Sequence, residues 1–257
     1  MIEDNGKFRI SAWMAETIKV AALSVPAAKL LLFLIYFQDL EEDSWPEHLV
    51  DEVTLKQHFA FPSQFRNLGL ATKSGSARFL RKPVEELKAL GMLFANLEIA
   101  PCGKYLNWQF SEAAKDVMSA MDRYALLEAA DVQHCSSRYD PVLLTQITLH
   151  RNMRMPQFSL IQLDPRFVTD VRSSTLSAFK AGYMTRILKP SLQKWADLNK
   201  HTYAVSYKQN GVSPGYTDVV VRIRHTDTRW PEGRFLKFDP RSHVYLIEPS
   251  ASKNPVK

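Results

Sequence analysis

Polar side chains gather on one predicted helix, at residues 182–199, and their types suit the binding of duplex DNA. Apolar residues recur there at helical spacing and form a single stripe of Met184, Leu188, Leu192, Trp195 and Leu198. Off that stripe lie Thr185, Arg186, Lys189 and Gln193. Arg can read guanine through two hydrogen bonds, Gln can read adenine, and cations bind phosphates. The pattern therefore predicts a DNA-contacting face, which Lys180 and Tyr183 precede.

Two alternating runs follow this helix and predict a β-hairpin. The apolar members are Tyr203, Val205, Tyr207, Val219, Val221 and Ile223. Between the runs lie Asn210-Gly211 and Pro214-Gly215, both turn signals. Lys208 stands near the tip, and Arg222 and Arg224 lie on the polar face of the return strand. A helix followed by such a hairpin is the second half of a winged helix, so these cations are predicted to contact phosphates or the minor groove.

A weaker copy of this pattern occupies residues 76–110. Leu80, Val84, Leu87 and Gly91 share one helical face, and two alternating runs at 93–99 and 105–110 predict a hairpin. The opposite helical face carries Arg78, Arg81, Lys82 and Lys88, which are candidate DNA contacts. Both copies contain a Lys-Pro pair, at 82–83 and 189–190. The sequence thus predicts two tandem domains of one type.

Charge divides the chain into an acidic half and a basic half. Residues 1–133 hold 14 Lys and Arg against 18 Asp and Glu, a net charge of −4. Residues 134–257 hold 19 against 9, a net charge of +10. A strongly basic half predicts a polyanionic partner. We therefore expect double-stranded DNA to bind mainly to the second half. For the first half, both a DNA-binding surface and a protein interface remain possible from the residues.

The element order predicts an α+β protein of two tandem winged-helix domains joined by a linking helix. Ser24 and Pro26 open an apolar helix, and Pro141 opens another. Residues 111–132 contain neither Gly nor Pro and favour helix. The predicted organisation is an N-terminal arm or helix at 1–22, a first winged helix and candidate dimerisation domain at 23–110, a linking helix at 111–133, a second, mainly DNA-binding winged helix at 134–228, and a tail at 229–257.

Shorter segments complete this expectation. Residues 53–59 read as a short helix, and residues 158–163 resemble a short second helix with its lead-in. The tail is expected to be ordered partly through Trp230, Phe235 and Phe238.

The sequence contains few residue patterns that would indicate an enzyme. The seven histidines form no His-x-His pair, and no Gly-rich phosphate loop is present. The acidic run at 41–51 lacks the spacing of a calcium loop, and Cys102 and Cys135 lack metal-type spacing. No apolar run reaches the roughly 18 residues of a membrane span, and the first ten residues do not resemble a secretory signal. We expect a cytoplasmic protein that is not an enzyme and uses no cofactor or metal.

Three segments resemble the replication initiators of iteron-containing plasmids. Residues 24–32, SVPAAKLLL, are similar to their opening helix, and residues 137–139, SRY, to their Ser-Lys-Tyr-Ala-Leu segment. Residues 183–195, YMTRILKPSLQKW, are similar to their helix with a Leu-x-Pro-Ala-Leu core. Asp140-Pro141 departs from the helix-forming pair usual in that family, and residues 41–52 and the tail have no counterpart there.

The resemblance implies two winged helices that bind repeated origin sequences, with the second reading sequence most strongly. It also implies a dimer–monomer balance in which dimers repress and monomers initiate, with the host initiator and the replicative helicase as partners. Two other functions stay open from the residues alone. They are a winged-helix transcription repressor or partition-type adaptor, and a protein-interaction module without catalysis.

Overall fold

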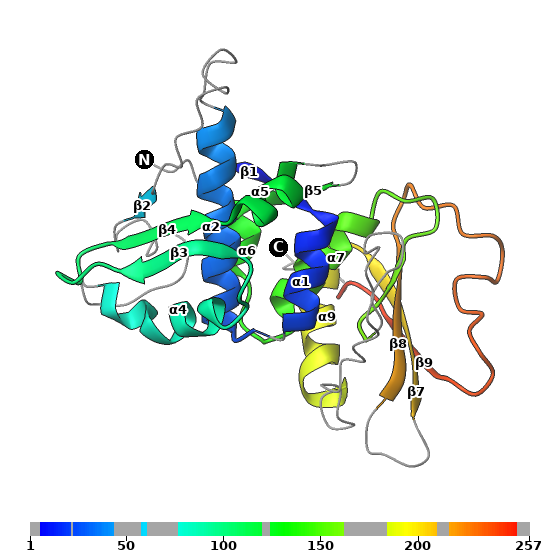
Figure 1. The fold of residues 1–257 in the computed structure, drawn as a ribbon. Coiled ribbons are helices and arrows are strands. Elements are labelled where there is room, and N and C mark those ends of the chain that lie inside the picture. The colour runs from blue at the N-terminus through cyan, green and yellow to red at the C-terminus, as the bar shows by residue number, and fades with distance from the viewer. Residues whose placement is uncertain are drawn as a thin grey trace, which may run out of the picture. The chain divides into compact units, whose positions relative to one another are not determined.

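Two compact units make up the chain in this computed structural model, and each is described by itself. Unit 1 is Met1–Thr145 and unit 2 is Gln146–Lys257. The structure describes residues 6–21, 23–43, 58–60, 77–119, 124–161, 184–209 and 216–250. These residues form a mixture of helices and mainly antiparallel strands, which confirms the α+β prediction (Figure 1).

The core of unit 1 is built around one apolar helix, α2 (Val25–Asp43). Every residue from Ala27 to Phe37 is buried, because this helix is covered on all sides by the rest of the unit. Ser24 caps the helix as predicted, since its Oγ accepts the N–H of Ala27 at 3.4 Å. The same hydroxyl donates to Oε2 of Glu86 at 2.5 Å and so ties the start of α2 to helix α4 (Arg81–Lys88).

A three-stranded antiparallel sheet packs beside this helix (Figure 1). It contains β2 (His58–Ala60), β3 (Phe94–Ile99) and β4 (Leu106–Phe110) in the order β2-β4-β3. A 3-10 turn, η2 (Ala77–Leu80), leads into α4 ahead of the hairpin. Leu80, Val84 and Leu87 are buried, so the predicted helix face and hairpin are confirmed. The helix expected at 53–59 is wrong at its end, where His58 and Phe59 lie in β2; residues 53–57 lie outside the described part.

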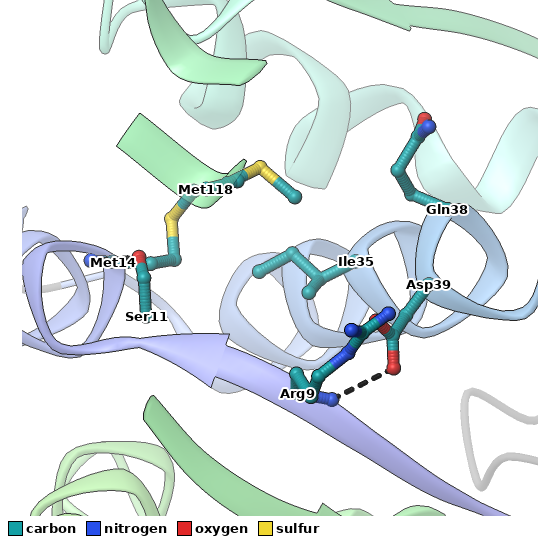
Figure 2. Close-up of a pocket in the computed structure, with 7 residues that line it drawn as sticks. All are labelled: Arg9, Ser11, Met14, Ile35, Gln38, Asp39 and Met118. Atoms are coloured by element: carbon teal, nitrogen blue, oxygen red, sulfur yellow. Dashed lines mark hydrogen bonds and ion pairs between the residues drawn. The ribbon is translucent and has the colours of Figure 1, made fainter. Parts of the chain in front are cut away.

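A second, two-stranded sheet joins distant parts of unit 1. Strand β1 (Lys7–Ser11) pairs antiparallel with β5 (Tyr124–Glu128), and helix α1 (Ala12–Ala21) follows β1. Figure 2 shows Arg9 of β1 turned toward Asp39 of α2. The Arg9 Nε donates to Asp39 Oδ1 at 2.6 Å and its backbone N–H donates to Oδ2 at 2.9 Å, which fixes β1 against α2.

The predicted linking helix over residues 111–133 is wrong. That segment forms α5 (Glu112–Ser119), strand β5 and a short helix, α6 (Ala129–Gln133). Ala125 and Leu127 are buried while Tyr124, Leu126 and Glu128 are exposed, which is the period of a half-buried strand. Pairing with β1, more than a hundred residues earlier, outweighs the helix propensity of the Ala-Leu-Leu-Glu run.

Helix α7 (Asp140–His150) begins in unit 1 and ends in unit 2. Pro141 lies in its first turn, as predicted, where its missing N–H removes no helical hydrogen bond. Asp140 is fully buried, and its Oδ2 accepts the N–H groups of Ser136 and Ser137, each at 2.7 Å. The carboxylate therefore holds the turn at residues 136–139 against the start of α7, a role that the resemblance did not anticipate.

Unit 2 contains a four-stranded antiparallel sheet in the order β6-β8-β7-β9. Its members are β6 (Gln157–Ser159), β7 (Thr202–Gln209), β8 (Tyr216–Arg224) and β9 (His243–Ile247). The predicted hairpin is confirmed by pairs such as Val205 with Val221. Residues 158–163 were expected to form a short helix with its lead-in. Phe158 lies in β6, where it pairs with Val221, and residues 162–163 lie outside the described part. Strand β9 lies in the tail, where no strand was expected.

The two units repeat one order of elements. Among the described residues, a helix (α2, or α7 as it enters unit 2) comes first and a short strand follows it. After an undescribed segment come a helix that starts with a non-α turn and then a hairpin. In each, the short strand pairs with the second strand of the hairpin, giving β2-β4-β3 and β6-β8-β7. The faint internal repeat of the sequence is thus a repeat of topology.

Candidate nucleic-acid interface

The helix of unit 2 that carries the predicted DNA face has two parts. A π-helical turn, η3 (Met184–Leu188), leads directly into α9 (Lys189–Asn199). Pro190 lies in the first turn of α9, so its ring and missing N–H are accommodated at the junction and the chain continues without a break. Met184, Leu188, Leu192 and Trp195 are buried as predicted, but Leu198 is 43% exposed and lies outside the core stripe.

Thr185, Arg186 and Lys189 are exposed at the start of this helix. The Lys189 Nζ lies 5.6 Å from the centroid of the Tyr245 ring, so β9 lies beneath it. Three predicted site residues therefore share one exposed surface, formed where η3 meets α9.

Gln193, one turn further along, is engaged inside the unit. Its Nε2 donates to the carbonyl oxygen of Glu248 at 2.8 Å and to Oδ1 of Asp197 at 3.2 Å. Asp197 in turn accepts the backbone N–H of Ser250 at 2.6 Å, and this hydrogen bond is the main cause of its lowered pKa. To read a base, Gln193 would have to exchange the Glu248 carbonyl for DNA.

Arg222 is also engaged by its own unit. Its Nη1 donates to the carbonyl oxygens of Arg234, Phe235 and Lys237, at 2.6, 3.2 and 2.9 Å. Its Nε donates to Oε1 of Gln157 at 3.2 Å. Burial lowers the pKa of Arg222, although a guanidinium stays charged at neutral pH. The side chain holds the segment between β8 and β9 in place, and its predicted DNA contact stays a prediction.

Arg224 and Lys208 lie beside the same segment. The Arg224 guanidinium carbon is 4.8 Å from the centroid of Phe235, and the Lys208 Nζ is 3.3 Å from Oδ2 of Asp239. Trp230 donates to the carbonyl oxygen of Ile223 at 2.7 Å. The expectation that Trp230, Phe235 and Phe238 order the tail is confirmed by these contacts and by the stacking of Phe238 on Arg222.

No protein-family model matches the chain, and no curated protein matches it. Among solved structures, it matches the Pi initiator protein in complex with iteron DNA. The match has a TM-score of 0.56 at 12% sequence identity, and it covers 87% of this chain and 99% of that chain. The fold is similar to that of the Pi initiator protein. This confirms the resemblance to iteron-plasmid initiators at the level of the overall fold.

The match to the Pi initiator protein covers 87% of this chain, which is more than unit 2 contains, so it includes residues of unit 1. In unit 1, Arg81, Lys82 and Lys88 are exposed along α4, as predicted. Arg78 belongs to η2, and its side chain is outside the description. Glu85 is exposed on the same helix, so α4 carries charges of both signs, whereas the exposed charged residues at the start of α9, Arg186 and Lys189, are both basic.

Some predicted site residues lie outside the described part of the chain. Lys180 and Tyr183 precede η3 in the undescribed segment 162–183, and the turn at 210–215 that would form the hairpin tip is also outside it. Their predicted DNA contacts stay predictions.

Other kinds of site are not formed by the described residues. No group of three His, Cys, Asp or Glu side chains there could hold a metal ion. No helix in those ranges is long and apolar enough to cross a membrane. A pocket in unit 1 is lined by Arg9, Ser11, Met14, Ile35, Gln38, Asp39 and Met118 (Figure 2). Its guanidinium and carboxylate already bond each other, which indicates a structural role.

Strand β9 adds polar residues that sequence reasoning missed. Tyr207 stacks on His243 with ring centroids 5.2 Å apart, and it meets Tyr245 edge-on at 5.9 Å. Polar and apolar residues alternate at 243–247, and this pattern could have indicated a strand in the segment that was predicted as a tail.

Proposed function

We propose that this chain binds duplex DNA sequence-specifically and initiates replication of a plasmid at repeated origin sites. The observation that carries this proposal is the likeness, over most of both chains, to a Pi initiator protein solved with iteron DNA. The charge of the second half supports it independently, because +10 over residues 134–257 suits a polyanion.

We further propose that both units are winged helices. The shared order of elements supports this, since each hairpin follows a helix and receives the earlier short strand on its second strand. In unit 2 the helix η3–α9 would enter the major groove, with Arg186 and Thr185 near base edges and Lys189 near phosphates.

The two units are proposed to have different roles, DNA binding in unit 2 and dimerisation in unit 1. Unit 2 carries most of the DNA affinity, since its helix exposes Arg186 and Lys189 beside a basic hairpin. Unit 1 is the candidate dimerisation domain, where the net charge is negative and α4 mixes acidic and basic residues. A homodimer, the host initiator and the replicative helicase are the proposed protein partners. The proposed activity is binding in the cytoplasm, without catalysis or a cofactor.

Titration of a duplex probe at increasing salt tests this function. Counterion release should make the logarithm of affinity fall steeply with the logarithm of salt concentration, by about 0.9 per neutralised phosphate. Arg186→Ala should weaken binding of a selected duplex by about 1–3 kcal/mol if the side chain reads a base, and Lys189→Ala should reduce the salt slope by about one.

Lys237→Ala is a matched control, because this exposed lysine lies between β8 and β9, next to Arg222 on the other face of the sheet from α9. It should bind like the unchanged protein. An affinity that does not change with salt concentration would contradict the proposed function. Full affinity in both Arg186→Ala and Lys189→Ala would contradict the placement of the DNA-binding surface on η3 and α9.

A further inference from the structure

Strand β9 places an aromatic row beside the proposed recognition helix. The row consists of Tyr245, Tyr207 and His243, whose rings follow one another with centroid separations of 5.9 and 5.2 Å. Tyr207 pairs with His243 across β7 and β9, and Tyr245 pairs with Val205. Because side chains two apart in a strand share a face, the three rings project from one face of the sheet.

That face is the one that α9 covers. Lys189 of α9 lies over the Tyr245 ring, and the Tyr245 hydroxyl contacts Sδ of Met184 at 2.8 Å. Tyr203 and Val205, on the same face of β7, are buried. Tyr245 therefore lies beneath the start of the helix, and His243, at the other end of the row, is exposed.

We propose that Lys189 and this aromatic row bind the sugar–phosphate backbone of duplex DNA, so that β9 extends the DNA-binding surface of unit 2. This inference rests on the proposed function. An ammonium, a tyrosine hydroxyl and an imidazole N–H are all donors that suit phosphate oxygens. Each phosphate of a DNA strand carries one negative charge, so a row of donors can face neighbouring phosphates of one strand.

The arrangement favours duplex DNA over single strands. Single-strand binding needs aromatic faces on which separated bases can stack. Here Tyr207 and His243 stack on each other at an interplanar angle of 27°, and Lys189 covers the face of Tyr245. The ring faces are therefore occupied, and the Lys189 ammonium and the His243 imidazole are the exposed polar groups, which suits a backbone contact.

An arbitrary duplex of about two helical turns is the probe, because phosphate contacts do not depend on sequence. Tyr207→Phe removes one hydroxyl and keeps the stacked ring, and His243→Thr keeps a strand-forming residue. Each should weaken affinity for this duplex about three- to ten-fold, the factor expected for one hydrogen bond. Leu246→Thr is the matched control, since Leu246 is 40% exposed on the opposite face of β9. It should change affinity less than about two-fold.

The outcomes separate this inference from the proposed function. Arg186→Ala should act mainly on a selected duplex, whereas the aromatic-row variants should act on selected and arbitrary duplexes alike. If Arg186→Ala weakens specific binding while Tyr207→Phe and His243→Thr bind like the unchanged protein, the inference is overturned and the function stands. A loss confined to a single-stranded oligonucleotide of the same length also overturns it. If the unchanged protein binds neither duplex, both proposals fail.

Discussion

The guanidinium carbon of Arg222 lies 3.8 Å from the centroid of the Phe238 ring. Arg222 also donates to three backbone carbonyl oxygens of residues 234–237. The ring contact and these hydrogen bonds together form a clamp, in which Arg222 holds this segment. Figure 1 shows the segment between β8 and β9 extending from the sheet on the side away from α9. A single arginine from the predicted DNA-binding strand thus holds residues 234–237, which belong to the segment predicted as a tail.

Arg222→Lys should loosen this segment although it keeps the positive charge. An ammonium cannot reproduce the planar fork or its stacking, so we expect a loss of roughly 1–2 kcal/mol of stability. Hydrogen exchange of backbone amides in residues 229–242 should become faster. Arg229→Lys, at an exposed position, should leave the exchange unchanged. Equal exchange in Arg222→Lys and the unchanged protein would show that the clamp has no energetic role.

A buried ion pair in α1 should be costly to break. Glu16 and Lys19 lie 2.6 Å apart with side chains 2% and 1% exposed. Glu16→Gln removes one charge and leaves the other buried, which should reduce stability by about 3–5 kcal/mol in urea unfolding. The double variant Glu16→Leu with Lys19→Leu should recover most of that loss, because it leaves no charge without a counterion.

The surface pair Glu112–Lys115 has the same spacing and provides the comparison. Its atoms are 3.4 Å apart, but the Glu112 side chain is 66% exposed. Glu112→Gln should therefore change stability by less than about 1 kcal/mol. A small effect of Glu16→Gln, similar to that of Glu112→Gln, would contradict the buried geometry in unit 1.

His201 should make unit 2 less stable as pH falls. Burial, with the charges of His225 and Arg151 adding to it, lowers the pKa of His201 to about 4. The folded state keeps this ring neutral, while the unfolded chain takes up a proton below its ordinary value of about 6.5. The contribution to stability is therefore complete above pH 6.5 and is lost as pH falls toward 4. Between pH 7.5 and 5 we expect a loss of about 1–2 kcal/mol.

Replacing His201 with Gln should flatten this dependence, because the side chain no longer titrates. Urea midpoints of the two proteins at several pH values provide the measurement. His243→Gln makes the same substitution at an exposed histidine and is measured beside it as the comparison. If the slope survives in His201→Gln, another group causes the acid sensitivity.

The hydrogen bond between Asp197 and Ser250 should hold the residues after β9 against α9. The Ser250 N–H is the largest cause of the lowered pKa of Asp197, so Ser250→Pro, which removes that donor, should raise the pKa toward its ordinary value. A carboxyl with a lowered pKa stabilises the folded state above its ordinary pKa and loses this contribution as pH falls. Carboxyl NMR titration of Asp197 checks this. An identical titration in both proteins would mean that Ser250 does not set the pKa.

Local patterns predicted the elements whose partners are close in sequence. Leu80, Val84 and Leu87 share one helical face, and Val219, Val221 and Ile223 alternate along a strand. In both cases the buried side is visible in the residue spacing alone. The two hairpins were found for the same reason, since each pairs neighbouring runs across a turn.

Strands with distant partners could not be found in this way. Tyr124–Glu128 consists largely of good helix formers and becomes a strand because β1 lies beside it. Phe158 joins β6 through Val221, and β9 joins β7 after a long connection. Local alternation, as at 243–247, can indicate a strand, but it does not identify the strand's partner, and the hydrogen-bonding partner decides the conformation.

The candidate site shows the same division. Arg186 and Lys189 are exposed where the helical period placed them. The engagement of Arg222 and Gln193 depends on carbonyl groups of residues 234–248, a segment without a motif of its own. Exposure follows from periodicity, whereas hydrogen-bond partners follow from the tertiary fold.

Selection of bound duplexes from a random pool tests the central claim most directly. The unchanged protein, with Arg186→Ala as the comparison, is incubated with the pool, and bound duplexes are recovered and sequenced. We predict enrichment of one sequence that binds better when repeated in tandem, and loss of that enrichment in Arg186→Ala. A single palindrome would indicate a repressor in place of an initiator. No enrichment by the unchanged protein would contradict sequence-specific DNA binding and leave a protein-interaction module as the better account.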